Sequence, residues 1–436
     1  MLKKALRKII GTKKSNKSSK INSISKLNLK DKTALVRVDF NVPIEKKGRT
    51  RKISDNNKIK AVIPTIKYLL QQNCKIVLMS HLGRPKGHVV PELRMNIVAK
   101  ELKILLPRKK VTKLNNCIGA EIRDRISKMK SKEIVLLENL RFYKEEEEND
   151  YAFAHSLANL AEVYINDAFA ICHRKHASVS AITKFVPSCA GFLLQTEILN
   201  MNRAFRPERP AVWLMGGAKL KKVELLENAF KKADCILIGG ALAFSFLKAR
   251  GISVGHSMVD KDSVRLARQV LMHKNAWKII LPLDFNCAKN ISTKAKVIER
   301  NFNKIGNDEI GLDIGPKTVE LFELYLRKAK TVVWNGPMGY FEISKFAKSS
   351  RHLAKVIAEI PVFSICGGGE TSAMIKKFKL VKGFTHISTG GGASLAYLSG
   401  NKLPGIQALE DNYVTFHRKI FRKKARKKSF HTRLGV

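Results

Sequence analysis

The chain alternates short apolar, β-branched runs with longer stretches in which apolar residues recur at helical spacing. Runs that are apolar on both faces are typical of parallel strands covered by helices on each side. The pattern predicts ten strands, at residues 33–40, 75–82, 133–140, 162–169, 210–217, 235–242, 278–285, 331–339, 362–369 and 384–392.

Regular alternation of strands and helices predicts an α/β fold with parallel sheets. The 436 residues are enough for two or three domains that each bury a core of their own. We therefore expect two Rossmann-like, doubly wound domains, with ligands beyond the carboxyl ends of the strands.

The strands of the first half end in polar and basic residues. Guanidinium groups at such ends suit a small phosphorylated or carboxylated compound, because the guanidinium fork matches both anions. The loop histidines His173 and His176 are either part of such a site or ordinary loop residues, and Asp39 either binds a ligand or caps a turn. The residues at these strand ends are Asp39, Asn41, His81, Arg84, Arg141, His173 and Arg174.

The strands of the second half end in glycines. Glycine allows backbone N–H groups and a helix N-terminus to approach the phosphates of a nucleotide. A tight strand-to-helix turn explains any one cluster as well, but five clusters at equivalent points favour a ligand. An anion site in one half and a nucleotide site in the other indicate phosphoryl transfer across a cleft. The clusters are Gly216–Gly217, Gly239–Gly240, Gly336, Gly367–Gly369 and Gly390–Gly392.

Composition narrows the class of protein. Apolar residues make up 44% of the chain, yet no apolar run approaches the ~20 residues of a transmembrane helix, so we expect no membrane span. The seven cysteines are scattered, without a CxxC pair or a Cys/His cluster at zinc-like spacing. This distribution predicts reduced thiols in an intracellular compartment.

The net charge of +46 exceeds what a small anionic substrate requires. The first 30 residues hold ten Lys or Arg and no acid, and the segment after Asp411 holds nine more and no acid. Without both tails, 63 basic and 36 acidic residues leave the body at +27. Such a field attracts polyanions, of which nucleic acid is the commonest in a cell, although a generally lysine-rich composition explains the charge too.

The N-terminal segment has apolar residues at helical spacing, Leu2, Ala5, Leu6, Ile9 and Ile10, opposite a basic face. This pattern is typical of an organelle presequence and favours a mitochondrial compartment over the cytoplasm. A disordered basic arm is the alternative interpretation.

Seven motifs, in order, resemble those of the phosphoglycerate kinase family. They are VRVDFNVP (36–43), SHLGRP (80–85), LENLRF (137–142), NDAF..CHR.HAS (166–178), GLDIGP (311–316), WNGPMG.FE (334–342) and HISTGGGASL (386–395). The resemblance covers residues 24 to 410. It implies reversible phosphoryl transfer between 1,3-bisphosphoglycerate and ADP, with Mg²⁺ bound to ADP or ATP, after closure of a hinge.

The resemblance also implies a domain plan. Residues 25–189 would bind 3-phosphoglycerate, residues 190–206 would form the interdomain helix, and residues 207–395 would bind the nucleotide. The segment 396–411 would return to the first domain, between basic extensions at 1–24 and 412–436. The protein would be monomeric unless it belongs to a larger assembly.

Site residues carry over by motif. The substrate's hydroxyl and carboxyl end would contact Asp39 and Asn41, and its remote phosphate would contact His81, Arg84, Arg141 and Arg174. Glu342 would contact the ribose, and Glu370 the magnesium. The remaining nucleotide ligands would be Gly216, Gly217, Gly240, Gly368, Gly369, Thr371 and Lys222, and the catalytic residues would be Lys58, Lys219, Lys222, Gly368 and Gly391.

Four departures from the family pattern concern the reacting centre. Lys58 stands where the family has a catalytic arginine, and an ammonium lacks the planar fork. Glu370 replaces an aspartate, Ala170 replaces a glycine that can adopt positive φ, and the loop before Lys222 is one residue short. Two hypotheses follow: a working but impaired phosphoglycerate kinase, or a kinase-like scaffold that binds RNA within a ribonucleoprotein such as an organellar ribosome.

Overall fold

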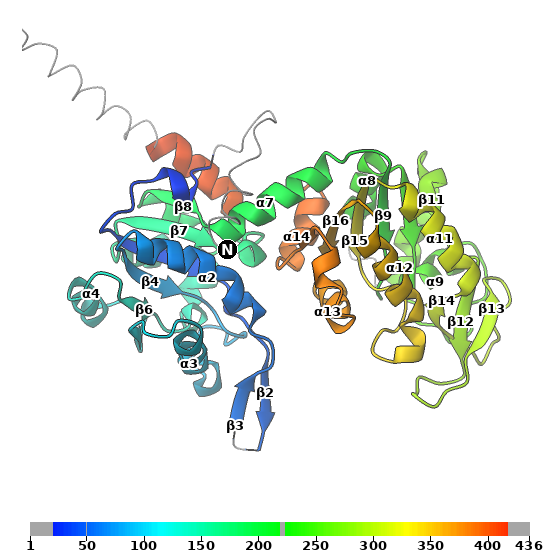
Figure 1. Cartoon of the computed structure of the whole chain (residues 1–436), viewed down its shortest axis with the longest axis horizontal. Coiled ribbons are helices and arrows are strands. Elements are labelled where there is room, and N and C mark those ends of the chain that lie inside the picture. Colours follow the sequence, from blue (N-terminus) through cyan, green and yellow to red (C-terminus); the bar gives the residue numbers. More distant parts are fainter. Residues whose placement is uncertain (1–20, 49, 219–222, 417–436) are drawn as a thin grey trace, which may run out of the picture. The chain divides into compact units, whose positions relative to one another are not determined.

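The computed structural model describes residues 21–48, 50–218 and 223–416. This part of the chain forms two compact units (Figure 1). Unit one contains residues 21–197 and 402–416, and unit two contains residues 198–401. The boundary falls within helix α7 (Phe192–Phe205), so one continuous helix links the units along the chain.

Unit one is built on a six-stranded parallel sheet in the order β5-β6-β4-β1-β7-β8. Non-consecutive neighbours mean that the chain crosses over between strands, as parallel pairing requires. The strands are β1 (Thr33–Val38), β4 (Lys75–Met79), β5 (Val111–Lys113), β6 (Ile134–Leu136), β7 (Val163–Asp167) and β8 (Ser188–Ala190), and the helices are α2 (Asn57–Gln71), α3 (Asn96–Leu105), α4 (Ala120–Ser127), α5 (Lys144–Glu148) and α6 (Tyr151–Ala158).

The central strands of this sheet are buried along almost their whole length. Helix α2 packs its apolar residues onto the same core. Helix α6 is capped by the residue before it: the Asp150 carboxylate accepts a hydrogen bond from Phe153 N at 2.7 Å. A short antiparallel hairpin, β2 (Ile44–Lys47) and β3 (Thr50–Ile53), precedes α2. The sequence pattern did not predict this hairpin, because its strands are only four residues long and polar.

The described end of the chain belongs to unit one. Residues 404–416 are helical, and Asn412 is buried against the segment before β8. Its Oδ1 accepts from Ser188 N at 2.9 Å and its Nδ2 donates to Val186 O at 2.9 Å. Gly405 N donates to Cys172 O at 2.9 Å, so this segment reaches the loop after β7.

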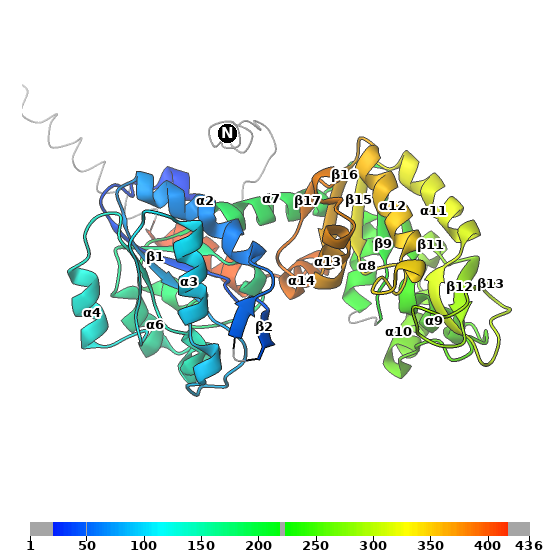
Figure 2. The ribbon, with the colours of Figure 1, turned by 60° about the horizontal axis from the view of Figure 1, so that its bottom comes forward.

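Unit two contains a second six-stranded parallel sheet, in the order β11-β10-β9-β15-β16-β17. Helices cover both faces, with α8, α9 and α10 on one and α11 and α12 on the other (Figure 2). The strands are β9 (Ala211–Met215), β10 (Cys235–Ile238), β11 (Ile279–Ile280), β15 (Thr331–Asn335), β16 (Phe363–Gly367) and β17 (His386–Ile387), and the helices are α8 (Val223–Lys232), α9 (Gly240–Ala249), α10 (Lys261–Leu271), α11 (Pro316–Lys328), α12 (Lys348–Glu359), α13 (Gly369–Lys377) and α14 (Gly392–Leu398).

One predicted strand is wrong in detail. Residues 278–285 do not form a single parallel strand, because Pro282 interrupts the run and cannot donate to a ladder. The run divides between β11 in the large sheet and β12 (Asp284–Ala288) in a separate antiparallel sheet. That sheet has the order β13-β12-β14, with β13 (Ile298–Asn301) and β14 (Ile310–Ile314).

The predicted α/β class with two parallel, doubly wound sheets is otherwise confirmed. In the described residues, no helix is long and apolar enough to cross a membrane. All seven cysteines are free and buried, four in unit one and three in unit two. Burial raises the pKa of every one of these thiols.

Candidate functional site

The carboxyl ends of β6, β4, β1 and β7 bring together polar residues from distant parts of unit one. These strands are neighbours in the sheet and run parallel, so their ends lie along one edge. Asp39 and Asn41 follow β1, His81 follows β4, and Arg141 follows β6. The loop after β7 adds Arg174, whose N–H donates to Ile171 O at 2.9 Å.

Asp39 links strand β1 to the start of helix α2. Its side chain is nearly buried; Oδ1 accepts from Asn41 N at 3.1 Å, and Oδ2 accepts from Lys58 Nζ at 2.7 Å. Lys58 lies in the first turn of α2 with its side chain 35% exposed, whereas Lys60 is exposed. Of these two lysines, Lys58 is therefore the one whose ammonium contacts the site.

Asn41 connects the loops after β1 and β4. Its Oδ1 accepts from Gly83 N at 2.9 Å, and nearby the Ser80 hydroxyl accepts from Phe40 N at 2.9 Å. These two side-chain contacts fix the loop after β1 against the loop after β4, which carry several of the predicted ligand residues.

Arg37 is fully buried beneath this edge and fixes the state of His81. Its Nη2 donates to His81 Nδ1 at 3.2 Å, and a guanidinium can only donate. Nδ1 must therefore accept, which leaves the proton of the neutral ring on Nε2. Burial, together with the charges of Arg37 and Arg141, holds the pKa of His81 well below its usual range. His81 is thus a neutral imidazole that carries its proton on Nε2.

A buried carboxylate, Glu146, compensates the charge of Arg37. Its Oε1 lies 3.8 Å from Arg37 Nη2 and accepts from the Ser178 hydroxyl at 2.6 Å, and its Oε2 accepts from Ser178 N at 2.9 Å. Burial opposes ionisation of Glu146, but the neighbouring His176, the charge of Arg37 and the hydrogen bonds from Ser178 keep its pKa below the usual value. The sequence reasoning did not select Arg37 or Glu146. The available signal was an arginine inside an otherwise apolar strand.

The predicted phosphate-binding arginines differ in exposure. Arg141 is buried, its Nη1 donates to Gly83 O at 2.8 Å, and its Nε lies 3.2 Å from Glu147 Oε1. Arg174 is half-buried and Arg84, which follows Gly83, is exposed. Burial and the neighbouring charge of Arg174 lower the pKa of Arg141 despite Glu147, which indicates a concentration of positive charge.

The loop after β7 shows the surroundings of His176 and the backbone conformation of Ala170. His176 is buried with Nδ1 3.7 Å from Glu146 Oε1, so it belongs to the network beneath the site. Ala170 lies in a short 3₁₀ turn, η4 (Phe169–Ile171), and does not have positive φ. The alanine therefore fits this loop without backbone strain.

In unit two, four of the predicted glycines are used by the fold itself, through backbone hydrogen bonds or close packing. Gly216 N donates to Asn335 O at 2.8 Å and Gly240 N donates to Met338 O at 2.9 Å, so these N–H groups are used by the fold. A Cβ at Gly336, where φ is +89°, would lie 2.2 Å from Gly216 O. Gly217 N likewise donates to Pro337 O at 2.9 Å. These glycines shape the loops, and the N–H groups of Gly216, Gly217 and Gly240 are already hydrogen-bonded to carbonyls and are not free to bind a phosphate.

A second set of glycines faces open space. A Cβ at Gly369 or at Gly391 would meet nothing within 4 Å, and Gly368 and Gly391 have φ of +93° and +50°. Gly369 is the first residue of α13, whose leading N–H groups are the usual binding site for phosphate at a helix N-terminus. These positions leave room for a ligand to approach the backbone.

A cavity of about 210 Å³ lies beside these loops. Its walls are largely apolar and aromatic, with a few polar groups at the rim, which suits a flat heterocycle. The pocket includes Gly217, Gly240, Phe244, Met258, Phe285, Ile291, Asp313, Met338, Tyr340, Phe341, Glu342 and Glu370.

The predicted polar ligands of the nucleotide have distinct surroundings. Glu342 and Glu370 are exposed lining residues of this cavity. Thr371 is fully buried and its hydroxyl accepts from Gly336 N at 2.7 Å, so it ties α13 to the loop after β15. Within the described ranges, no group of three or more His, Cys, Asp or Glu side chains is arranged to hold a metal ion. Lys219 and Lys222 lie outside the described residues.

The chain and its fold are similar to those of known proteins. The profile of the family described as "Phosphoglycerate kinase" matches residues 24–401. A curated phosphoglycerate kinase of Dictyoglomus turgidum is 48% identical over 388 residues, covering 88% of this chain and 96% of that protein. One of Moorella thermoacetica is 45% identical over 393 residues, covering 89% and 99%. The solved phosphoglycerate kinase of Coxiella burnetii superposes with a TM-score of 0.80 at 35% identity, covering 90% of this chain and all of that one.

Proposed function

Because the chain belongs to the phosphoglycerate kinase family, a family of phosphotransferases with a carboxyl group as acceptor, we propose how its own residues perform that reaction. Unit one would hold 3-phosphoglycerate or 1,3-bisphosphoglycerate, and unit two would hold ADP or ATP. Two observations support this division: the cationic strand edge within unit one and, separately, the apolar cavity within unit two.

For the substrate, Asp39 and Asn41 would orient the hydroxyl and carboxyl end. His81 would donate from Nε2, because Arg37 occupies Nδ1. Arg141, Arg84 and Arg174 would hold the remote phosphate; Arg141 is the best positioned, since its Nη1 is anchored on Gly83 O. A neutral donor and fixed guanidinium groups bind an anion without reorganising during turnover.

For the transfer, a carboxylate oxygen of 3-phosphoglycerate attacks the terminal phosphorus of ATP while the bond from that phosphorus to ADP breaks. Negative charge spreads over the transferring oxygens, so fixed positive charge and in-line placement supply most of the catalysis. Lys58 would provide one such charge from the start of α2. Lys219 and Lys222 would provide others.

For the nucleotide, the aromatic and apolar cavity would take the base, and Glu342 at its rim would contact the ribose. The phosphates would lie against Gly368, Gly369 and Gly391, where a Cβ would find open space at Gly369 and Gly391. Glu370 fits a contact with magnesium, because its carboxylate is exposed in the lining of the cavity and Mg²⁺ in kinases is held by one or two carboxylates and by phosphates. The ion supplies neutralisation of the phosphate charge.

The test is formation of ATP from 1,3-bisphosphoglycerate and ADP, followed with a coupled assay. We expect turnover by the wild-type chain and a roughly 100-fold or larger loss of kcat/KM in Arg141→Gln. The matched control is Arg123→Gln on α4, an exposed arginine of the same unit, which should behave as wild type. Turnover no greater than that of Arg141→Gln would favour the inactive scaffold instead.

Compartment and partners are separate proposals. The basic amphipathic pattern of residues 1–10 supports entry into an organelle such as the mitochondrion. Residues 1–30 fused to a fluorescent reporter should become protease-protected in isolated mitochondria, and a reporter that stays accessible would contradict this. RNA binding is proposed from the net positive charge of the body of the chain.

A further inference from the structure

Four neighbouring strands of unit two are each preceded by a short basic segment. The segments are residues 206–210 before β9, 230–234 before β10, 272–278 before β11 and 327–330 before β15; together we call them the amino edge. They contain nine lysines and arginines and two acids, Glu208 and Asp234, and Asp234 is ion-paired with Arg209. Three of these strands, β9, β10 and β15, end at the opposite edge in the glycine loops beside the cavity.

The amino edge is one continuous row. Strand order places β11, β10, β9 and β15 side by side, so their starts span about 15 Å at normal strand spacing. Lys330 N donates to Pro210 O and Asp234 N donates to Ala211 O, both at 2.8 Å. Lys278 Nζ donates to Phe230 O and Ala233 O, also at 2.8 Å, which joins the segment before β11 to the end of α8.

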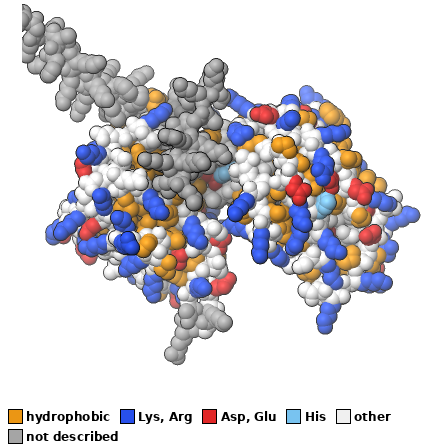
Figure 3. All heavy atoms as spheres, in the orientation of Figure 1, with side chains coloured by type: hydrophobic (Ala, Val, Ile, Leu, Met, Phe, Trp, Pro, Cys, Tyr) orange, Lys and Arg blue, Asp and Glu red, His pale blue; other side chains and the backbone are white. Residues whose placement is uncertain are grey.

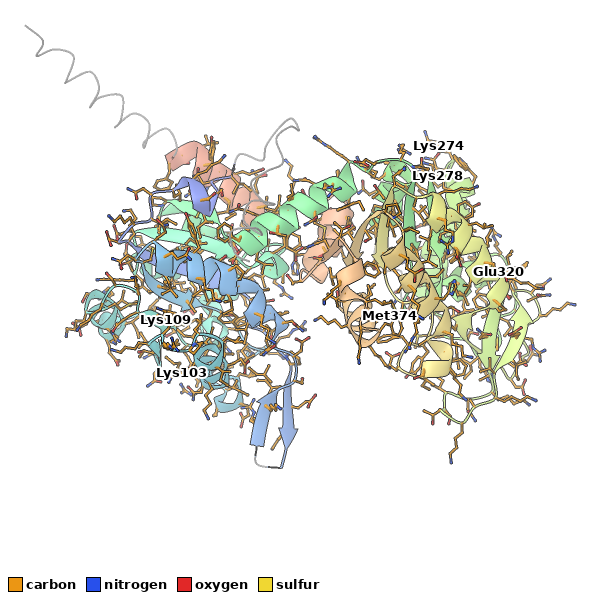
Figure 4. All side chains as sticks on the ribbon, viewed as in Figure 1. Lys103, Lys109, Lys274, Lys278, Glu320 and Met374 are labelled. Carbon is orange, nitrogen blue, oxygen red and sulfur yellow. The ribbon has the colours of Figure 1, made fainter. Side chains whose placement is uncertain are left out.

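Two large apolar side chains stand out of the row at the β11 end. Trp277 is 70% exposed and Met272 is 75% exposed. The Lys278 ammonium lies 5.6 Å from the centre of the Trp277 ring, and exposed Lys274 lies in the same segment. Figure 4 shows Lys274 and Lys278 close together at this end of the unit.

Some of these lysines have a purely structural explanation. Cations in the last turn of a helix complement its dipole, as Lys231 and Lys232 do at the end of α8 and Lys328 at the end of α11. That explanation does not cover Lys274 or Lys330, which lie outside helices, or the exposed indole. Lysine and arginine are also spread over both units, so charge alone does not select this place (Figure 3).

We propose that the amino edge, with Trp277 at its end, binds single-stranded nucleic acid. An exposed aromatic ring beside a row of cations is the arrangement by which such proteins stack a base and track the phosphates. A single strand fits better than a duplex, because only an unstacked base can lie on the indole. The glycine loops lie at the other edge of the sheet, so nucleic acid bound here leaves the nucleotide cavity open.

The test uses the full chain and a fluorescein-labelled oligouridylate of about 12 nucleotides, a length within the usual site size. Fluorescence anisotropy gives the affinity between about 50 and 200 mM KCl, where phosphate contacts make it fall with salt. We expect Trp277→Ala to weaken binding roughly 5- to 150-fold, the range for loss of one stacked base. Ile104→Ala in unit one, at the same 70% exposure, is the matched control and should bind as wild type.

The cationic row is tested by charge reversal. Lys231→Glu, Lys274→Glu and Lys330→Glu together should make the log–log salt dependence shallower by about 2, since each phosphate contact contributes about 0.7 for single strands. The control triple reverses exposed Lys103, Lys109 and Lys130 of unit one and changes the net charge equally. The control triple should keep the salt dependence of wild type. Kinase activity of both triples should match wild type and verifies folding.

Three results would overturn the proposal. Equal weakening by the two triples would mean that binding is a diffuse effect of net charge. Displacement of the oligonucleotide by saturating MgADP would place it in the nucleotide cavity. Binding of phosphatidylserine vesicles through Trp277 without binding of the oligonucleotide would assign the edge to a membrane surface. None of these results bears on the kinase assay, so the two proposals fail separately.

Discussion

Lys58 Nζ lies 2.7 Å from Asp39 Oδ2, so the lysine that stands where the resemblance implies an arginine is tied to a carboxylate that we propose as a substrate ligand. One ammonium offers a point charge, whereas a guanidinium can contact Asp39 and the transferring group at once. Lysine keeps the positive charge at this position, but it cannot contact Asp39 and a second anionic group at the same time, whereas an arginine could.

We therefore predict that Lys58→Arg raises kcat about tenfold, equivalent to about 1.4 kcal/mol, while the KM for phosphoglycerate changes little. Lys58→Ala should lower kcat roughly 100- to 1,000-fold, the usual cost of one transition-state donor. Steady-state kinetics on both variants are compared with Lys60→Arg, an exposed neighbour that should be neutral. A lower kcat in Lys58→Arg would mean that the surrounding site has adapted to lysine.

The contact between Arg37 and His81 predicts a protonation state that can be measured. Long-range ¹H–¹⁵N NMR at neutral pH should find His81 as the Nε2–H tautomer. Because the pKa of His81 is depressed in the folded protein, the unfolded chain takes up a proton below its ordinary pKa of about 6.5 and the folded chain does not. Stability should therefore fall as pH drops through about 6.5, and less so in His81→Gln. Equal pH dependence of unfolding in both proteins, or a protonated Nδ1, would contradict the assignment.

Substitution by alanine should affect stability at one glycine of unit two and nucleotide binding at another. Gly336→Ala should lower the free energy of unfolding by about 1–3 kcal/mol or more, since its Cβ would collide with Gly216 O at positive φ. Gly369→Ala should fold normally, because its Cβ meets open space, but should raise the KM for ADP. Thermal unfolding and ADP kinetics on the pair separate packing from ligand approach. Unchanged ADP kinetics in Gly369→Ala would remove this residue from the phosphate site.

Asp313, in the lining of the apolar cavity of unit two, should make stability depend on pH. Burial raises its pKa to about 8, so between the unfolded value near 3.9 and pH 8 the folded protein holds a proton that the unfolded chain has lost. Stability contributed by this group should fall as pH rises across that range and level off above it. Urea unfolding at several pH values should show the free energy of unfolding of Asp313→Asn increasing relative to wild type as pH rises. The exposed control Asp262→Asn should keep a constant difference from wild type. A constant difference would mean that Asp313 is ionised throughout.

The sequence was most informative where polar or charged residues directly follow a buried strand. Apolar runs located the parallel strands, and the next residues named Asp39, His81 and Arg141, which the structure places along one edge. Membership of the family is confirmed by the relatives. The individual roles of the site residues stay predictions.

Other features depend on contacts that a linear pattern does not contain. Arg37 and Glu146 are 109 positions apart, so their pairing, and the tautomer of His81 that results, required the fold. The glycine clusters looked alike in sequence, yet Gly336 is packed against backbone and Gly369 is not. The antiparallel sheet of β12 to β14 was missed because Pro282 divides an apolar run between two sheets.

The seven buried thiols make the protein its own reporter of local opening. A thiol reagent reacts with thiolate, and these groups are both inaccessible and held protonated, so labelling of the native protein has to wait for an opening event. Cys74, Cys117, Cys172 and Cys189 would record openings of unit one, and Cys235, Cys287 and Cys366 those of unit two. Labelling rates mapped by peptide mass, with and without each substrate, would therefore time the motions of the two halves independently in an unmodified chain.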